Sequence, residues 1–287
     1  MSFEEFMNSE IASKIDNFSG VCGIHIQSLD TPDSYSYNLN EVFPTASEIK
    51  LFVLTALLKK ADLGDLDLGS KVTVTEQNKV GGSGLFKEFK DGAEFTLKDA
   101  AMAMTIVSDN TATNICIDAL GGPEEVNSHI VDHGMKHTRL GGRIDLSNVS
   151  EDPSSLGVTT PYESVDFVRQ LIGGQVLSKT GTALAFDILR RQQVADQFPR
   201  FLPYSIYAPE LGIKQDLMLA HKTGYVPSVR TDVGYIKIRE KSFVYGVLSK
   251  ECADDSMYFD NEASVFAGEV GASLYRGVCE FSLPENH

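Results

Sequence analysis

The side chains best suited to chemistry fall in three short motifs spread along the chain. They are Ser-Glu-Ile-Lys at 47–50, Ser-Asp-Asn at 108–110 and Lys-Thr-Gly at 222–224. A serine hydroxyl attacks a carbonyl only when a neighbouring group accepts its proton. A lysine can accept that proton when burial or nearby positive charge lowers the pKa of its amine. These residue types therefore indicate a hydroxyl nucleophile activated by amines, which is the chemistry of acyl transfer.

The first motif places a nucleophile and a base on one predicted helix. Ser47 and Lys50 are three residues apart in a stretch from Ala46 to Lys60 that has a helical pattern, so both side chains share one face. The free N–H groups of a first helical turn also favour a developing oxyanion. The alternative is a capping serine beside a solvated lysine. The apolar run at 51–54 predicts a buried helix, and this favours a functional lysine.

The second motif stands between two predicted helices. One helical stretch begins at Leu97, and another starts near Thr111. A short turn between them can direct Ser108 and Asn110 into a cleft. Helix capping is the alternative, because Ser, Asp and Asn are all favoured at the N-cap.

The third motif occurs twice, and the local context separates the two copies. The copy at 179–181 leads into a helix and lacks the preceding strand of a phosphate-binding loop, so we interpret it as a helix start. The copy at 222–224 follows an apolar run and precedes a strand, which predicts a place on a sheet edge. There Lys222 and Thr223 would hold a substrate carboxylate, and Gly224 would allow close approach.

Alternation and helical periodicity predict the elements that must position these motifs. Strands are expected at 21–28, 34–38, 215–221, 231–239 and 243–250. Beyond the helix that carries Ser47, helices are expected at 97–108, 112–120, 123–133, 162–172, 181–193 and 261–280, the last of them stopping near Pro284.

This order predicts an α+β fold with two units. Residues 1–61 and 206–287 would form one antiparallel sheet flanked by helices, because the two ends of the chain can share strands. Residues 62–205 would form a separate all-helical lobe.

Composition excludes several classes of function. The chain has 287 residues, 42% of them hydrophobic and 23% charged, which is typical of a soluble globular protein. Its net charge of −15 argues against binding nucleic acid or an anionic membrane surface. The acidic first residues contain no leader pattern, so we expect a cytoplasmic protein, or a secreted one if a signal peptide has been removed. We expect a monomer that acts on a small molecule.

Cysteines and histidines give no sign of a cofactor. Four cysteines lie far apart, which favours buried free thiols over a disulfide or a metal site. His129, His133 and His137 are four residues apart, but Gly134 interrupts that helix and no acidic partner fits a zinc pattern. We therefore expect neither a metal nor an organic cofactor, and we interpret His133 as a favourable contact at a helix C-terminus.

The three motifs together resemble those of class A β-lactamases and other penicillin-recognising serine hydrolases. Further landmarks follow in the family's order, at Pro-Thr-Ala-Ser 44–47, Ser-Asp-Asn-Thr-Ala-Thr-Asn 108–114, Gly-Gly 121–122, Thr-Arg-Leu 138–140 and Thr-Thr-Pro 159–161. The resemblance covers residues 18 to 280. It implies the same α+β fold and a hydrolase that forms an acyl-enzyme.

The resemblance also implies roles for individual residues. Ser47 would be acylated, Lys50 would take its proton, and Ser108 with Lys222 would protonate the leaving nitrogen. The backbone N–H groups of Ser47 and Tyr225 would form the oxyanion hole, and Asn110 would hold the substrate's side-chain amide. Arg230 lies one residue from the place where the family often carries an arginine for the substrate carboxylate.

One segment departs from the family pattern. In class A β-lactamases the Ω-loop, which corresponds to residues 141–158 here, carries a glutamate that activates the deacylating water, followed by an asparagine. Asn148 matches the asparagine, but Ile144 stands at the glutamate's place and Asp145 is one residue out of register. Deacylation is therefore expected to be slow. The alternatives are a D-alanyl peptidase or esterase of the same fold, and a sensor module that is acylated once.

Overall fold

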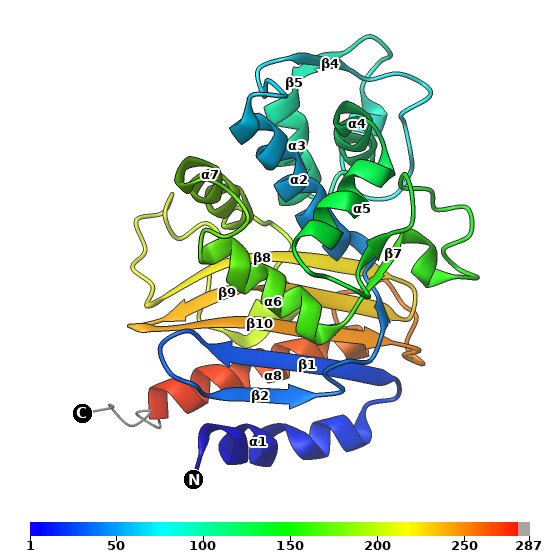
Figure 1. The fold of residues 1–287 in the computed structure, drawn as a ribbon. Coiled ribbons are helices and arrows are strands. Elements are labelled where there is room, and N and C mark those ends of the chain that lie inside the picture. Colours follow the sequence, from blue (N-terminus) through cyan, green and yellow to red (C-terminus); the bar gives the residue numbers. More distant parts are fainter. Residues whose placement is uncertain (281–287) are drawn as a thin grey trace.

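A five-stranded antiparallel sheet forms the base of the molecule in the computed structural model, which describes residues 1–280 (Figure 1). The strand order is β2-β1-β10-β9-β8. The strands are β1 (Val21–Ser28), β2 (Ser34–Tyr37), β8 (Leu217–Val226), β9 (Val229–Ile238) and β10 (Lys241–Lys250). Residue 21 pairs with residue 250, so the two ends of the chain share one sheet. The expected α+β fold is confirmed.

Helices cover both faces of this sheet. Helices α1 (Phe3–Asn17) and α8 (Glu262–Glu280) lie on one face, and α6 (Pro161–Ile172) crosses the other (Figure 1). The predicted stop of the last helix near Pro284 lies outside the described residues. Helix α1 was not predicted, although Ser2 and Glu5 form a capping box at its start. Its apolar stripe, which includes Phe3, Met7 and Ile11, is buried.

The helical part stands above the β8 edge of the sheet (Figure 1). It contains α2 (Lys50–Leu63), α3 (Leu97–Ile106), α4 (Asn110–Leu120), α5 (Pro123–Asp132) and α7 (Lys179–Leu189), with a small hairpin of β4 (Lys71–Thr73) and β5 (Glu94–Thr96). Helix α2 is its centre, because every residue from Lys50 to Leu58 is buried. One apolar core surrounds α2, and a second lies between the sheet, α1 and α8.

Three differences from the predicted elements concern the site. The helix expected from Ala46 begins with a separate 3₁₀ turn, Ala46–Ile49, before α2 starts at Lys50. Strand β8 continues to Val226, so the Lys-Thr-Gly motif lies within an edge strand instead of after it. A third, short sheet joins β3 (Phe43–Pro44), β7 (Gly157–Thr159) and β6 (Arg139–Leu140) just before that turn.

The structure also bears on the cysteines, on membrane-spanning helices and on the other Lys-Thr-Gly motif. The four cysteines are free thiols, and Cys22, Cys116 and Cys252 are buried. Among residues 1–280, no helix has the length and apolar character that crossing a membrane requires. The Lys-Thr-Gly copy at 179–181 starts α7, where Ser178 is the N-cap and accepts a hydrogen bond from the Gly181 amide.

Candidate active site

The three motifs meet at the junction of the sheet and the helical part, beside a cavity of about 260 Å³. Ser47 contributes to its wall from the 3₁₀ turn, Asn110 from the start of α4, and Tyr225 from β8. The other lining residues are Gly82, Ser83, Ile144, Leu146, Val149, Ser150, Leu156, Val226, Pro227 and Met257. Residues distant in the sequence therefore form one small-molecule-sized pocket next to a serine.

Ser47 is held in place by a strained and closely packed turn. Ala46, directly before it, has a positive φ of 44°, which is uncommon for a residue with a side chain. Strand β8 presses against the turn, because a Cβ added at Gly224 would lie 2.8 Å from the Ser47 nitrogen. The Thr231 hydroxyl on β9 donates to the Thr45 carbonyl at 3.0 Å. The backbone at Ser47 is thus fixed to two strands of the sheet.

Lys50 has no exposed surface, and three oxygens surround its amine. Its Nζ donates to the Ser108 carbonyl at 2.7 Å, to Ser108 Oγ at 3.1 Å and to Asn110 Oδ1 at 2.6 Å. Burial holds the pKa of this amine well below its usual value, and the positive charge of Lys222 lowers it further. The charge of Asp109 opposes the shift. The result is an amine that loses its proton more readily than an exposed lysine does.

Ser108 lies between the two buried lysines. Its Oγ accepts from Lys50 Nζ and from Lys222 Nζ, both at 3.1 Å. The residue has a φ of 56°, so the turn is strained where the hydroxyl enters the site. Asp109 stabilises the turn by capping α4 through the Ala112 amide at 2.8 Å. The alternative of simple capping therefore applies to Asp109, while Ser108 faces the lysines.

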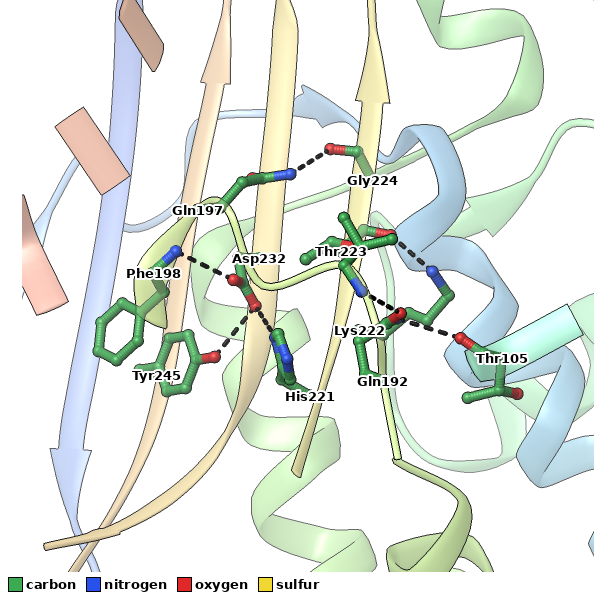
Figure 2. Close-up of polar contacts among 11 residues, drawn as sticks. Thr105, Gln192, Gln197, Phe198, His221, Lys222, Thr223, Gly224, Asp232 and Tyr245 are labelled. Carbon is green, nitrogen blue, oxygen red and sulfur yellow. Dashed lines mark hydrogen bonds and ion pairs between the residues drawn. The ribbon is translucent and has the colours of Figure 1, made fainter. Parts of the chain in front are cut away.

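Lys222 is the second buried amine, and it projects from the edge strand β8 (Figure 2). Its Nζ donates to Ser108 Oγ at 3.1 Å and to the Thr223 carbonyl at 2.7 Å. Burial lowers its pKa to about 7, and the negative charges of Asp232 and Glu48 oppose that shift. Lys222 can therefore exchange a proton with Ser108 at physiological pH.

The numbers of donors and lone pairs on Lys50, Ser108 and Lys222 allow a proton to move between them. A hydroxyl has one donor and two lone pairs, and a neutral amine has two donors and one lone pair. Neutral Lys50 can donate to the Ser108 carbonyl and to Asn110 Oδ1, which leaves its lone pair free to accept a proton. Lys222 can donate to Ser108 Oγ while Ser108 gives its own proton elsewhere. The three groups can pass protons without rearrangement of the backbone.

The other predicted binding residues lie at varying distances from the pocket. Asn110 lines it, although its side chain also donates to the Gly81 carbonyl at 2.9 Å and accepts from Lys50. Tyr225 lines it as well. Thr223 has no exposed surface, and its hydroxyl has no hydrogen-bond partner among the described residues. Gly224 lies close to the Ser47 backbone, a contact that the motif did not predict.

The expected carboxylate-binding role of Arg230 requires correction. Its side chain is 4% exposed and lies outside the cavity lining. The guanidinium donates to the backbone carbonyls of Val226, Val229 and Ser256 at 2.7–2.9 Å. It also donates to Ser264 Oγ at 3.3 Å. Since its donors are directed at these groups beneath the β8–β9 turn, Arg230 braces the turn instead of facing a substrate.

The Ω-loop brings an apolar residue to the pocket. Ile144 is 4% exposed and lines the cavity. Asn114 holds its backbone, because Asn114 Oδ1 accepts from the Ile144 amide at 2.7 Å and Asn114 Nδ2 donates to its carbonyl at 3.1 Å. The Asp145 and Asn148 side chains are exposed and do not line the cavity. Asp145 accepts from the Ser147 amide at 2.9 Å within the loop.

No acidic side chain lines the cavity among the residues that the structure describes. The carboxylate next to the nucleophile in sequence, Glu48, is turned away into the protein and has no exposed surface. It accepts a short hydrogen bond from Ser164 Oγ, while its Oε2 has no partner within the described chain. Burial raises its pKa to about 7. The only sequence signal for Glu48 is an acidic residue directly before a predicted buried helix.

A second buried acid, Asp232, lies on β9 (Figure 2). The sequence patterns did not single it out. Asp232 has no exposed surface and accepts from the Phe198 amide at 3.1 Å and from the Tyr245 hydroxyl at 3.0 Å. Its Oδ1 also lies 2.8 Å from His221 Nδ1. The alternating pattern of strands predicted Asp232 only as a strand residue, and its partners come from three separate segments.

Metal binding finds no support among the described residues, where no group of three His, Cys, Asp or Glu side chains converges. His129 is buried, and its Nε2 lies 3.1 Å from Thr55 Oγ1. His133 is the C-cap of α5, and its Nδ1 lies 2.8 Å from the His129 carbonyl oxygen. This is a contact at the helix C-terminus, as the sequence indicated.

Comparison with solved structures identifies the class of fold. PBP-A superimposes with a TM-score of 0.82 over 98% of both chains, at 24% identity. An ancestral class A β-lactamase gives a TM-score of 0.80 over 94% of this chain and 99% of that one, at 22% identity. The molecule thus has the class A β-lactamase fold.

Sequence comparison identifies the family. A family model described as the beta-lactamase enzyme family matches residues 7–278. Beta-lactamase CARB-4 of Pseudomonas aeruginosa is 32% identical over 58% of this chain and 57% of its own length. The match to the first curated relatives therefore spans less than two thirds of their length. Because the family model covers nearly the whole chain, the protein belongs to the beta-lactamase enzyme family.

Replacing Gly224 by alanine tests the contact between β8 and the nucleophile. The new Cβ would lie 2.5 Å from the Thr45 carbonyl oxygen and 2.8 Å from the Ser47 nitrogen, so the strand and the turn must separate. We expect the Ser47-dependent reaction that the motifs predict to slow at least ~10-fold and unfolding free energy to fall by about 1–3 kcal/mol. Stopped-flow acylation and urea unfolding measure these effects. Gly69→Ala, at an exposed turn, is the matched control, and equal effects of both substitutions would contradict the prediction.

Replacing Glu48 by glutamine tests its buried ionisation. A pKa of about 7 in the folded protein, against 4.5 when exposed, means that folding favours the protonated form. That stabilisation is complete below pH 4.5 and is lost as the pH rises through 7. The wild type should therefore lose about 3 kcal/mol relative to Glu48→Gln between pH 4.5 and 8. Urea unfolding at both pH values, with exposed Glu76→Gln as control, measures it, and a pH-independent difference would refute it.

Proposed function

We propose that the protein is a serine hydrolase in which Ser47 is acylated by a β-lactam or a related amide or ester. The observation that carries this proposal is the convergence of Lys50 and Lys222 on Ser108 Oγ, beside the pocket that Ser47 lines. Membership of the beta-lactamase family supports the same chemistry. We propose that acylation needs no cofactor, because side chains and backbone N–H groups can carry that step.

The acylation step conserves protons within the site. Ser47 Oγ attacks the carbonyl carbon, and its proton passes to the neutral amine of Lys50. The carbon–nitrogen bond then breaks as the leaving nitrogen receives a proton from Ser108 Oγ. Lys222 and protonated Lys50 each lie 3.1 Å from that oxygen and can replace its proton. The step ends with an ester at Ser47 and a protonated leaving amine.

The oxyanion formed during attack would be stabilised by the N–H groups of Ser47 and Tyr225. Ser47 belongs to the first turn before α2, and Tyr225 to the edge strand β8. Alternate N–H groups of an edge strand face away from its neighbour, so they can bind a ligand. The close approach of Gly224 to the Ser47 nitrogen brings these two segments together. Preorganised donors of this kind are typical of acyl-transfer sites.

Hydrolysis of the acyl-enzyme is proposed to be slow. Ile144 lines the pocket and cannot accept a proton, and Asp145 is exposed on the outside of the loop. Loss of a general base typically costs ~10²–10⁴-fold in rate. A mutant of the structural neighbour PBP-A has been solved as an acyl-enzyme complex with penicillin G. We further propose a monomer that acts on a small molecule, in keeping with the size of the cavity.

Mixing the protein with a penicillin and a chromogenic cephalosporin tests acylation. Intact-protein mass should increase by one acyl group, and Ser47→Ala should abolish this increase because the nucleophile is gone. The adduct should persist through many minutes of dilution. Absence of a Ser47-dependent adduct and of turnover with lactams, D-alanyl peptides and simple esters would overturn the proposal. Faster turnover of D-alanyl peptides than of lactams would instead identify a peptidase.

The Ω-loop explanation for slow hydrolysis has its own test. Ile144→Glu should place a carboxylate at the pocket and raise the deacylation rate at least ~10-fold. Ile144→Gln is the matched control, because it has the same length and cannot act as a base. Loss of the adduct over time, followed by mass spectrometry, gives the rate. Equal rates in both variants would show that the missing base does not limit hydrolysis.

A further inference from the structure

The lining of the cavity beside Ser47 divides into a polar part and an apolar part. Polar atoms from Ser83 and Asn110 lie on the side of the helical part, close to the lysines. The Ω-loop, the β8–β9 turn and Met257 form the rest of the wall, and most of their lining side chains are apolar. The apolar lining residues are Ile144, Leu146, Val149, Leu156, Val226, Pro227 and Met257.

The apolar wall is a packed structure. Ile144, Val149 and Leu156 are each at most 5% exposed, and they belong to one cluster with Ala46 and Val226. The cluster therefore connects the Ω-loop, the turn before Ser47 and the end of β8. The two hydrogen bonds between the Asn114 side chain and the Ile144 backbone hold this part of the loop in place. This wall can keep its shape when a ligand binds.

Leu146 and Met257 define the edges of the apolar part. A Cβ added at Gly82 would lie 2.9 Å from Leu146 Cδ1, so Leu146 packs against the loop that follows β4. Met257 also lines the cavity and is 54% exposed, so it belongs to the rim. A group that enters between them is removed from water on several sides.

Charged side chains are missing from the lining within the described part of the chain. Lys50 and Lys222 have no exposed surface, and Arg230 is directed at backbone carbonyls elsewhere. Transferring an unpaired charge into such surroundings is strongly unfavourable, whereas burying each methylene group is favourable. We infer that the substituent on the carbonyl side of the scissile bond, which lies against this lining when Ser47 is acylated, is uncharged and apolar. This inference rests on the proposed function and specifies its substrate class.

A series of p-nitrophenyl esters tests the acyl preference. The burst of p-nitrophenolate reports acylation, and the rate should rise about two- to fourfold for each methylene between acetate and valerate. The hemiglutarate ester has a similar length to valerate but ends in a carboxylate, and it should react at least ~10-fold more slowly than valerate. A rate that is independent of chain length, or that favours the hemiglutarate, would overturn the inference.

Charged substitutions at the edges should change this preference. Leu146→Lys should raise the hemiglutarate-to-valerate rate ratio at least ~10-fold, because an ammonium then faces the acyl carboxylate. Met257→Lys provides a second test at an exposed position where folding is not at risk. Leu63→Lys is the matched control, because Leu63 is 64% exposed at the end of α2 and outside the cavity. An unchanged ratio in both edge variants would contradict the inference.

These experiments separate failure of the apolar preference from failure of the proposed function. If Ser47→Ala abolishes the burst but chain length has no effect, the serine hydrolase stands and the apolar preference falls. If no ester or lactam gives a Ser47-dependent burst, the proposed function itself falls, and the inference falls with it.

Discussion

Two lysine amines buried against one hydroxyl are the constraint on which the site depends. Each lies 3.1 Å from Ser108 Oγ, and neither has any exposed surface. Two positive charges that close repel each other by about 3 kcal/mol at an effective dielectric constant near 20. Burial adds a further cost to each charge, so the pair cannot remain fully protonated near neutral pH. The surroundings must therefore supply both oxygen acceptors and compensating negative charge.

The fold supplies the compensating negative charges from elements that are far apart in sequence. Asp109 lowers the cost of charge on Lys50, while Asp232 and Glu48 do so for Lys222. The same Asp109 caps α4 and so fixes the turn in which Ser108 is strained. Catalytic geometry and local stability therefore share groups. A substitution at such a group would alter the protonation of the lysines and the position of the hydroxyl together.

Sequence motifs predicted the α+β fold and the residues that converge near Ser47, because their spacing within a helix, a turn and a strand constrains where side chains can lie. The direction of a side chain across an irregular segment could not be read in this way. Arg230 and Asp145 point away because neighbouring carbonyls and amides offer them hydrogen bonds. Glu48 and Asp232 were missed because their burial depends on Ser164, Phe198 and Tyr245, which are distant in sequence. Helix α1 was missed although its capping box is visible in the sequence.

The pairing of β1 with β10 has a consequence for protein synthesis. Residue 21 finds its partner at residue 250, and the edge strand with Lys222 and Gly224 can join the sheet only through β9 and β10. A ribosome makes the chain from the N-terminus, so Ser47 emerges long before the strands that hold it. The apolar core around α2 also contains Ala220, Val233 and Val244 from these strands, so it too is completed late. The nascent chain therefore carries Ser47 without the strands that hold it, and the site is complete only after the last quarter of the chain has left the ribosome.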